Sequence, residues 1–300
     1  MEKILGIKDP SDFKTKRIRI RKQGDSYDLM PSGEDLSFAE MMEYRKPVST
    51  DQMFSNMENQ GHVSANLGAA NYLTLEFEGQ DYLIGTRRMR EEFGDFVFGL
   101  IGGYVHSRDL ANPIIAAHEE ISEELLPCLS YGGLIRFSFA GEYLEQPFAK
   151  HFRNYPFSCE LREPSRYNLQ HGTKKVLIEG KPIVGKPVLF FEAERNCTML
   201  MFNYHLNFNN LDLSRLEVSL HNAEDTFNIE KGLIEAKLNP PGILLMELEQ
   251  GNLTDKIFSL NKGGLEPFSF SSLDLCEAYN VKGIMAKESK VPLEKALARC

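Results

Sequence analysis

The sequence contains no long apolar stretch. Its first 22 residues, MEKILGIKDPSDFKTKRIRIRK, are interrupted by charges throughout, so we expect no signal peptide there. No later window approaches the roughly 20 consecutive apolar residues that a membrane-spanning helix needs. The sequence therefore predicts a protein that does not associate with a membrane.

Cysteine patterns typical of metal sites or disulfide frameworks are also missing. The five cysteines are odd in number, lie far apart and form no CxxC or Cys/His pattern. Cysteines spaced in this way are typically reduced and mostly buried. The predicted compartment is therefore the cytoplasm. The cysteines are Cys128, Cys159, Cys197, Cys276 and Cys300.

The chain has no excess of basic residues. It carries 43 acidic and 34 basic side chains, a formal net charge of -9. This balance argues against coating of nucleic acid as the main role, because a phosphate backbone demands an excess of Lys and Arg. An acidic protein can still bind a small phosphorylated ligand through a local basic pocket or through metal ions. The expected partner is a small molecule rather than nucleic acid, and a homodimer is left open.

The distribution of polar and apolar segments divides the 300 residues into three parts. Residues 1–69 are polar and irregular and are expected to form an N-terminal extension, in which residues 16–22 (KRIRIRK) alternate like an edge strand. Residues 70–250 are expected to form the main domain. Residues 251–300 are expected to be a C-terminal extension, partly helical at 271–279 and 293–300.

The main domain begins with a strong β-hairpin pattern. Residues 72–77 (YLTLEF) and 82–87 (YLIGTR) flank a Glu-Gly-Gln turn. Residues 96–105 (FVFGLIGGYV) predict strand structure interrupted by glycine, and residues 113–126 predict an amphipathic helix that is capped by Asn112 and ended by Pro127. Further strands are expected at 134–143, 154–161, 187–194 and 242–248, and a helix at 226–237. Because strands and helices do not alternate strictly, the predicted class is α/β or α+β.

Three glutamates of the expected helix occupy one face. At about 100° per residue, Glu120, Glu123 and Glu124 are related by i,i+3 and i,i+4 spacing. Their carboxylates repel one another, and this repulsion can be relieved either by solvation, as on an ordinary exposed helix face, or by a divalent cation. Oxygen-rich sites of this kind suit Mg²⁺ or Mn²⁺. The neighbouring apolar arc, which is expected to dock on a sheet, consists of Ile114, Ala117, Ile121 and Leu125.

A pair of glycines precedes this helix. Gly102 and Gly103 follow an apolar strand, where glycine allows a tight bend and close approach of a ligand. A strand, a glycine turn, a loop and an acidic helix together favour a metal site for phosphoryl chemistry. Metal ions in such a site neutralise charge on phosphate oxygens and lower the pKa of a bound water, while a free carboxylate orients or deprotonates that water.

The segment 102–126, GGYVHSRDLANPIIAAHEEISEELL, resembles the box of the Nudix family. Gly103 is followed after five residues by Asp109, and the segment ends with the acidic pattern EEISEE at 119–124. The resemblance implies a Nudix-like α/β/α sandwich with a mixed sheet over residues 70–250. It also implies hydrolysis of a nucleoside-diphosphate-linked substrate with Mg²⁺ or Mn²⁺. Glu120, Glu123 and Glu124 would then be the metal-binding and catalytic acids, and Gly103 the turn glycine.

Two arginines at the end of the predicted hairpin complete the expected site. Arg87 and Arg88 also resemble the family and could clamp a substrate phosphate, because guanidinium groups match phosphate geometry. The alternative is that they pair with Glu91 and Glu92 at the surface.

The segment also departs from the family pattern. Nine residues instead of seven separate Asp109 from Glu119, Asp109 replaces a glutamate, Glu119 replaces an arginine that orients the acids, and Leu126 replaces a glycine. If Glu119 faces solvent, another basic residue such as Arg87 or Arg88 would take the orienting role. These departures favour an alternative function, a Nudix-fold module that binds a nucleotide or a protein without cleaving it. In a third interpretation, a different α/β fold uses the acidic helix only structurally.

Overall fold

The computed structural model describes residues 4–90, 95–128, 137–139, 142–143, 158–162, 175–193, 195–207, 219–228, 230–239 and 242–268. Within these residues the protein is a mixed α+β structure in which strands predominate over helices. The expected class is therefore confirmed. The described residues form three sheets, and none of their helices is long and apolar enough to cross a membrane.

The largest sheet has twelve strands and is mixed. Its central pair, β5 and β16, runs parallel, with Leu73 opposite Tyr204, and most of the other pairings are antiparallel. The strands are β5 (Leu67–Phe77), β6 (Gln80–Arg90), β7 (Asp95–Gly99), β8 (Ile101–Tyr104), β10 (Phe137–Phe139), β11 (Glu142–Tyr143), β12 (Ser158–Arg162), β15 (Val188–Glu192), β16 (Cys197–Asn207), β19 (Ile243–Glu249), β20 (Asn252–Asn261) and β21 (Gly264–Phe268).

The predicted hairpin is confirmed as β5 and β6. Phe77 pairs with Gln80 across a two-residue turn. Both turn residues have positive φ, 51° at Glu78 and 77° at Gly79. Such a turn matches the right-handed twist of the two strands, which explains why a short Glu-Gly connection suffices here.

The N-terminal residues form a second sheet and not the irregular extension that the sequence predicts. This five-stranded sheet has the order β14-β13-β3-β2-β4, and β13 pairs parallel to β3. The run at 16–22 is a strand, as predicted, but it lies inside the sheet and not at its edge. The elements are β2 (Thr15–Gln23), β3 (Ser26–Leu36), β4 (His62–Ser64), β13 (Lys175–Ile178), β14 (Lys181–Pro182), α1 (Phe38–Tyr44) and α2 (Thr50–Asn59).

A third, antiparallel sheet contains a region predicted to be helical. Its order is β1-β18-β17-β9, with β1 (Ile4–Lys8), β9 (Leu125–Cys128), β17 (Ser219–Asn228) and β18 (Leu233–Asn239). The helix expected at 226–237 is wrong, because this stretch belongs to the β17–β18 hairpin. Gly232, with φ 66°, lies in the connecting turn, where a left-handed backbone favours glycine.

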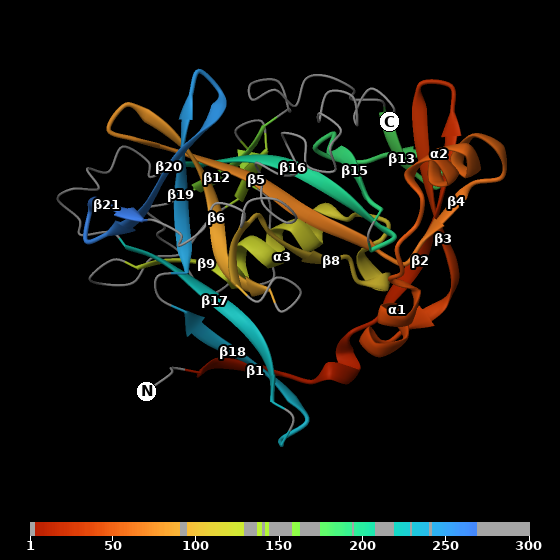
Figure 1. Ribbon diagram of the computed structural model, residues 1–300, viewed down its shortest axis with the longest axis horizontal. Coiled ribbons are helices and arrows are strands. Elements are labelled where there is room, and N and C mark those ends of the chain that lie inside the picture. Colours follow the sequence, from red (N-terminus) through yellow and green to blue (C-terminus); the bar gives the residue numbers. More distant parts are fainter. Residues whose placement is uncertain are drawn as a thin grey trace.

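One hydrophobic core joins the N-terminal sheet to the main sheet. Ile20 and Leu29 of the N-terminal sheet are fully buried in the same cluster as Leu73 of β5 and Ile121 of α3 (Ile114–Glu124). The opposite face of the large sheet holds a second hydrophobic cluster around Tyr72. The sequence does not predict that the buried residues divide into two clusters. Figure 1 shows α1, α2 and strands β2, β3 and β4 at one end of the molecule and β20 and β21 at the other.

The large sheet continues beyond residue 250. Strands β20 and β21 extend it on the far side of β19. The part of the expected C-terminal extension up to residue 268 is therefore made of strands and joined to the main sheet. The helices expected at 271–279 and 293–300 lie outside the described residues.

Candidate functional site

Helix α3 is fixed to the large sheet by its apolar side and by one buried amide. Ala117 and Ile121 are fully buried, as the predicted apolar arc requires. The Nδ2 atom of Asn71, on β5, donates to the carbonyl oxygens of Ile101 (3.2 Å) and Ala117 (3.1 Å). The helix, β5 and β8 are thus joined at one point.

The ends of α3 differ in detail from the prediction. The N-cap residue is Pro113 and makes no side-chain capping bond, so Asn112 is not the cap. The helix ends at Glu124, and Pro127 lies within β9 and not at the helix terminus. Both shifts stay within the usual uncertainty of helix boundaries.

Glu120 and Gly103 lie in direct contact. Gly103 is on β8, opposite Ala69 of β5. A Cβ atom built on Gly103 would overlap the carboxylate of Glu120. The glycine therefore allows an acid of α3 to approach the strand backbone, whereas the sequence predicts the close approach of a ligand at this position.

Gly102 has a different neighbour. A Cβ atom there would overlap the carbonyl oxygen of Ala69 and lie 2.7 Å from the Cα of Ala70. Both glycines are thus required by close approach, but one meets a flexible acid and the other meets backbone. Only Gly103 faces the predicted site.

The three predicted metal-binding acids lie on one side of α3 and are all partly exposed. These are Glu120, Glu123 and Glu124. In the parts of the chain that the structure describes, no three His, Cys, Asp or Glu side chains converge closely enough to hold a metal ion. The helix spacing therefore supplies a shared face, but the carboxylates are not gathered around one point.

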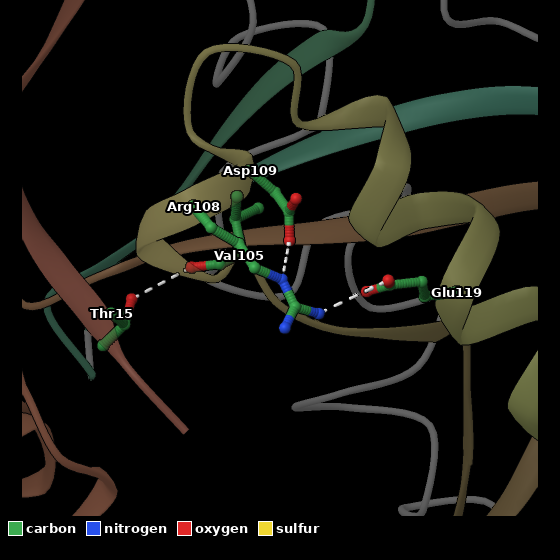
Figure 2. Close-up of polar contacts among 5 residues, drawn as sticks. All are labelled: Thr15, Val105, Arg108, Asp109 and Glu119. Carbon is green, nitrogen blue, oxygen red and sulfur yellow. Dashed lines mark hydrogen bonds and ion pairs between the residues drawn. The ribbon is translucent and has the colours of Figure 1, made fainter. Parts of the chain in front are cut away.

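A charged bridge connects the loop after β8 to α3. Figure 2 shows Arg108 between two acids, with Nε 3.1 Å from Oδ2 of Asp109 and Nη2 3.5 Å from Oε1 of Glu119. The loop segment that carries it is the short 3-10 helix η2 (Ser107–Asp109). Glu119 therefore faces a cation of the loop. Arg108 lies close enough to orient the acids of α3, the role that the sequence assigns to Arg87 or Arg88.

Arg108 is not among the residues that the sequence predicts for the site. The sequence does contain one indication of its role. Position 119 carries a glutamate where the family has an arginine, and an arginine, Arg108, directly precedes the loop acid Asp109. Sequence spacing alone does not indicate that these positions meet, because nine residues separate Asp109 from Glu119. The contact depends on how the loop returns to the helix.

Arg87 does not join the acids. It pairs along β6–β7 with Phe98, which belongs to the cluster on the face of the sheet opposite α3. Its guanidinium lies 5.7 Å from the ring centroid of Phe268. The structure therefore does not bring Arg87 together with the acidic helix, and its role in substrate binding stays a prediction. For Arg88 the structure describes the backbone, which pairs with Val97, and not the side chain.

The N-terminal segment supports the loop after Gly103. The hydroxyl of Thr15 donates to the carbonyl oxygen of Val105 at 3.1 Å (Figure 2), and the backbone N–H of Ser107 donates to the carbonyl oxygen of Lys14 at 2.8 Å. The ring of Phe13 lies 5.5 Å from those of Tyr104 and His106. Residues 13–15 therefore belong structurally to the candidate site, a role that the sequence does not reveal.

Behind the acidic side of α3 lies a buried histidine. His118 packs edge-on against Tyr204 with ring centroids 5.7 Å apart. Burial lowers the pKa of His118 to about 4, so the imidazole is neutral at neutral pH. His118 is therefore a neutral side chain of the core at this pH.

A polar network lies on the other face of β8. Arg45 donates through Nη1 to the hydroxyl of Tyr104 (2.9 Å) and through Nη2 to Sγ of Cys197 (3.1 Å). The Cys197 thiol in turn donates to Oε2 of Glu192 at 3.0 Å. Burial raises the pKa of Cys197 to about 12, so the group stays a thiol. The carboxylate of Glu192 accepts this bond and so belongs to the network.

Comparison with known proteins adds no family. No protein-family model matches the chain, and no curated protein matches it either.

Proposed function

We propose that the chain is a divalent-metal-dependent hydrolase of a nucleoside-diphosphate-linked substrate, built on a Nudix-like α/β/α sandwich. The observation that carries the proposal is the contact between the Glu120 carboxylate and Gly103, at the point where the loop to α3 begins. Glu123 and Glu124 lie on the same side of the helix. The donor set consists of carboxylate oxygens, which are the ligands that Mg²⁺ and Mn²⁺ prefer.

Each residue of the site has a defined part in this proposal. Glu120, Glu123 and Glu124 would hold Mg²⁺ or Mn²⁺, which when bound neutralises charge on phosphate oxygens and lowers the pKa of a water ligand. A carboxylate that is not engaged as a ligand accepts a proton from the attacking water. Gly103 leaves the space in which Glu120 reaches the strand backbone. A bound cation would offset the repulsion among the three acids.

A second candidate function is a module that binds a nucleotide or a protein without cleaving it. Two observations favour it: the acids do not converge in the described residues, and an anion occupies position 119. Such a module would bind ligand with little dependence on Glu124. A catalyst would lose turnover on the same substitution.

The deciding experiment is a substrate panel with Mg²⁺ or Mn²⁺. ADP-ribose, NADH, diadenosine polyphosphates, deoxynucleoside triphosphates and CoA are incubated with the wild type, and the phosphate products are measured. We expect turnover of one class, and a loss of about a hundredfold or more in Glu124→Gln, the change expected when a positioned acid or base is removed. Retained secondary structure must accompany that loss.

The matched control is Glu230→Gln. Glu230 is an exposed glutamate in the turn between β17 and β18, and its amide should leave turnover unchanged. Tight binding of a nucleotide without any product, equal in the wild type and in Glu124→Gln, would establish the binding module instead.

A further inference from the structure

Arg108 connects two carboxylates of unequal exposure. The Asp109 side chain is 9% exposed and that of Glu119 is 20% exposed, whereas Arg108 is 65% exposed. A nearly buried carboxylate is costly unless a cation or several hydrogen-bond donors compensate it. Arg108 supplies that cation to Asp109 and extends the same guanidinium to Glu119 on α3.

The Arg108 bridge ties the loop between β8 and α3 back to the helix, and both attachment points of this loop lie next to Glu120. The loop starts at Gly103, against which the Glu120 carboxylate lies. It returns through Arg108 to Glu119, the residue that directly precedes Glu120 on the helix. A guanidinium between Asp109 and Glu119 therefore fixes the first turn of the acidic face relative to the strand that Glu120 contacts.

The electrostatic setting makes a cation at this point important. Arg108 places a positive charge between the carboxylates of Asp109 and Glu119, next to the acids Glu120, Glu123 and Glu124 of the same helix. Like charges at helical spacing cost only a few tenths of a kcal/mol each at an exposed surface. Their influence on the orientation of ligating carboxylates is larger, because groups behind metal ligands commonly change metal affinity or activity about 10- to 100-fold.

We propose that Arg108 is a positioning residue for the metal-binding acids of α3, acting through Asp109 and Glu119 and touching neither metal nor substrate. The inference rests on the proposed function of this site. The cation that orients the acidic face comes from the loop and not from the helix. It follows that moving the positive charge from position 108 to position 119 preserves the arrangement, because residue 119 can pair with Asp109 directly.

Four variants test this inference. Arg108→Gln removes the charge, Arg108→Lys keeps it on a group that cannot form a two-pronged bridge, and Arg108→Gln/Glu119→Arg moves it to the helix. The matched control is Lys256→Gln. Lys256 is 66% exposed and pairs with the 14% exposed Glu247 at 2.8 Å on β19 and β20, so it resembles Arg108 in exposure and pairing but lies elsewhere.

Two quantities are measured for each variant: the Mn²⁺ dissociation constant, from free Mn²⁺ by electron paramagnetic resonance, and kcat and KM at saturating Mn²⁺ with the substrate that the panel identifies. For Arg108→Gln we expect weaker Mn²⁺ binding and a lower kcat, each by about 10- to 100-fold, with little change in KM. Arg108→Lys should lose less. The double variant should recover most of both quantities, and Lys256→Gln should match the wild type.

The outcomes separate the two levels of the proposal. An active wild type whose Mn²⁺ affinity and kcat are unchanged in Arg108→Gln would overturn the positioning role and leave the proposed function intact. The proposal would also be overturned if Arg108→Gln is folded but impaired and Arg108→Gln/Glu119→Arg regains neither Mn²⁺ affinity nor kcat. That result would show that a positive charge at position 119 cannot replace the one at position 108. A wild type that neither binds Mn²⁺ nor hydrolyses any substrate of the panel would overturn the proposed function, and the positioning role with it.

Discussion

The two sides of the segment from β8 to α3 differ in the exposure of their titratable groups, which are partly exposed on the outer side and buried on the inner side. On the outer side, Glu119, Glu120, Glu123 and Glu124 are partly exposed, and Arg108 is close by. On the inner side, burial keeps two groups uncharged: His118, between α3 and the large sheet, with a pKa of about 4, and Cys197, in the network on the other face of β8, with a pKa of about 12. Both buried groups are therefore uncharged at neutral pH, whereas the carboxylates predicted to bind a cation lie on the outer side.

Because of this difference, neighbouring residues of the same strand contact either the candidate site or the supporting network. Along β8, Gly103 faces the acids of α3, whereas Tyr104, the next residue, accepts a hydrogen bond from Arg45 in the network with Cys197. Successive residues of a strand point to opposite faces, which is why adjacent positions serve such different surroundings. A ligand is expected to change the outer side and to leave the inner network as it is.

The largest effect that we expect comes from the inner side on acidification. The folded-state pKa of His118 is lowered from 6.5 to about 4 by burial, so the unfolded chain binds the proton more readily. The stability that this neutral histidine confers is complete above pH 6.5 and is lost as the pH falls through 6.5 towards 4. The difference corresponds to about 3 kcal/mol in the free energy of unfolding.

Urea denaturation of the wild type and of His118→Leu at several pH values between 7 and 4 measures this loss. The wild type should lose more stability than the variant over the interval. Parallel curves for the two proteins would show that His118 is accessible to protons in the folded state, and the contrast between inner and outer sides would fail.

The second largest effect concerns the outer side. If Mn²⁺ binds the acids, a free concentration about 100 times its dissociation constant stabilises the fold by about 2.7 kcal/mol, because the ligand binds only the folded state. Thermal melting with increasing Mn²⁺ measures this, and Glu120→Gln/Glu124→Gln should remove the shift. An equal shift in the double variant would locate the ion elsewhere on the protein.

The acidic side of α3 could be predicted from sequence because it depends on local spacing. Helical periodicity places Glu120, Glu123 and Glu124 together, and the glycine pair indicates close approach. The bridge by Arg108 and the support by Thr15 could not be predicted, since both depend on contacts between residues far apart in sequence or across an irregular loop.

The same limit explains the errors in the fold. The sheet of the N-terminal residues takes two of its strands, β13 and β14, from residues 175–182, which no local pattern connects to residues 15–36. The stretch 226–237 has apolar residues compatible with either period, and its pairing in a hairpin decides for the strand. Arg87 was expected near the acids from its position after the hairpin, but strand alternation turns it to the opposite face.

The third prediction compares the two adjacent glycines. In Gly102→Ala the new Cβ meets backbone of β5, which cannot move aside, and we expect a loss of about 1–3 kcal/mol in the free energy of unfolding. In Gly103→Ala the Cβ meets the carboxylate of Glu120, which can rotate away at small cost in stability. Turnover and Mn²⁺ binding should fall in Gly103→Ala, because Glu120 is displaced.

Urea denaturation and Mn²⁺ binding of both variants test this pair. The expected result is a destabilised Gly102→Ala and a stable Gly103→Ala that binds Mn²⁺ weakly. A Gly103→Ala variant that binds Mn²⁺ as the wild type does would show that the approach of Glu120 to the strand is unnecessary for the site.

The smallest effect comes from the N-terminal support of the loop. Thr15 is fully buried, and its hydroxyl donates to the Val105 carbonyl at 3.1 Å. Thr15→Val keeps the shape of the side chain and removes the donor, so we expect a loss of about 1 kcal/mol in the free energy of unfolding. The control is Ser26→Ala, which removes an exposed hydroxyl bond to Gln23 and should change stability by less than about 0.5 kcal/mol. Because residues 13–15 hold the loop between Gly103 and Arg108, Thr15→Val should also speed amide hydrogen exchange at Ser107, whose N–H donates to Lys14. A variant that loses stability without faster exchange at Ser107 would make Thr15 a support of the core alone, and the loop would owe its position to Arg108 and Asp109.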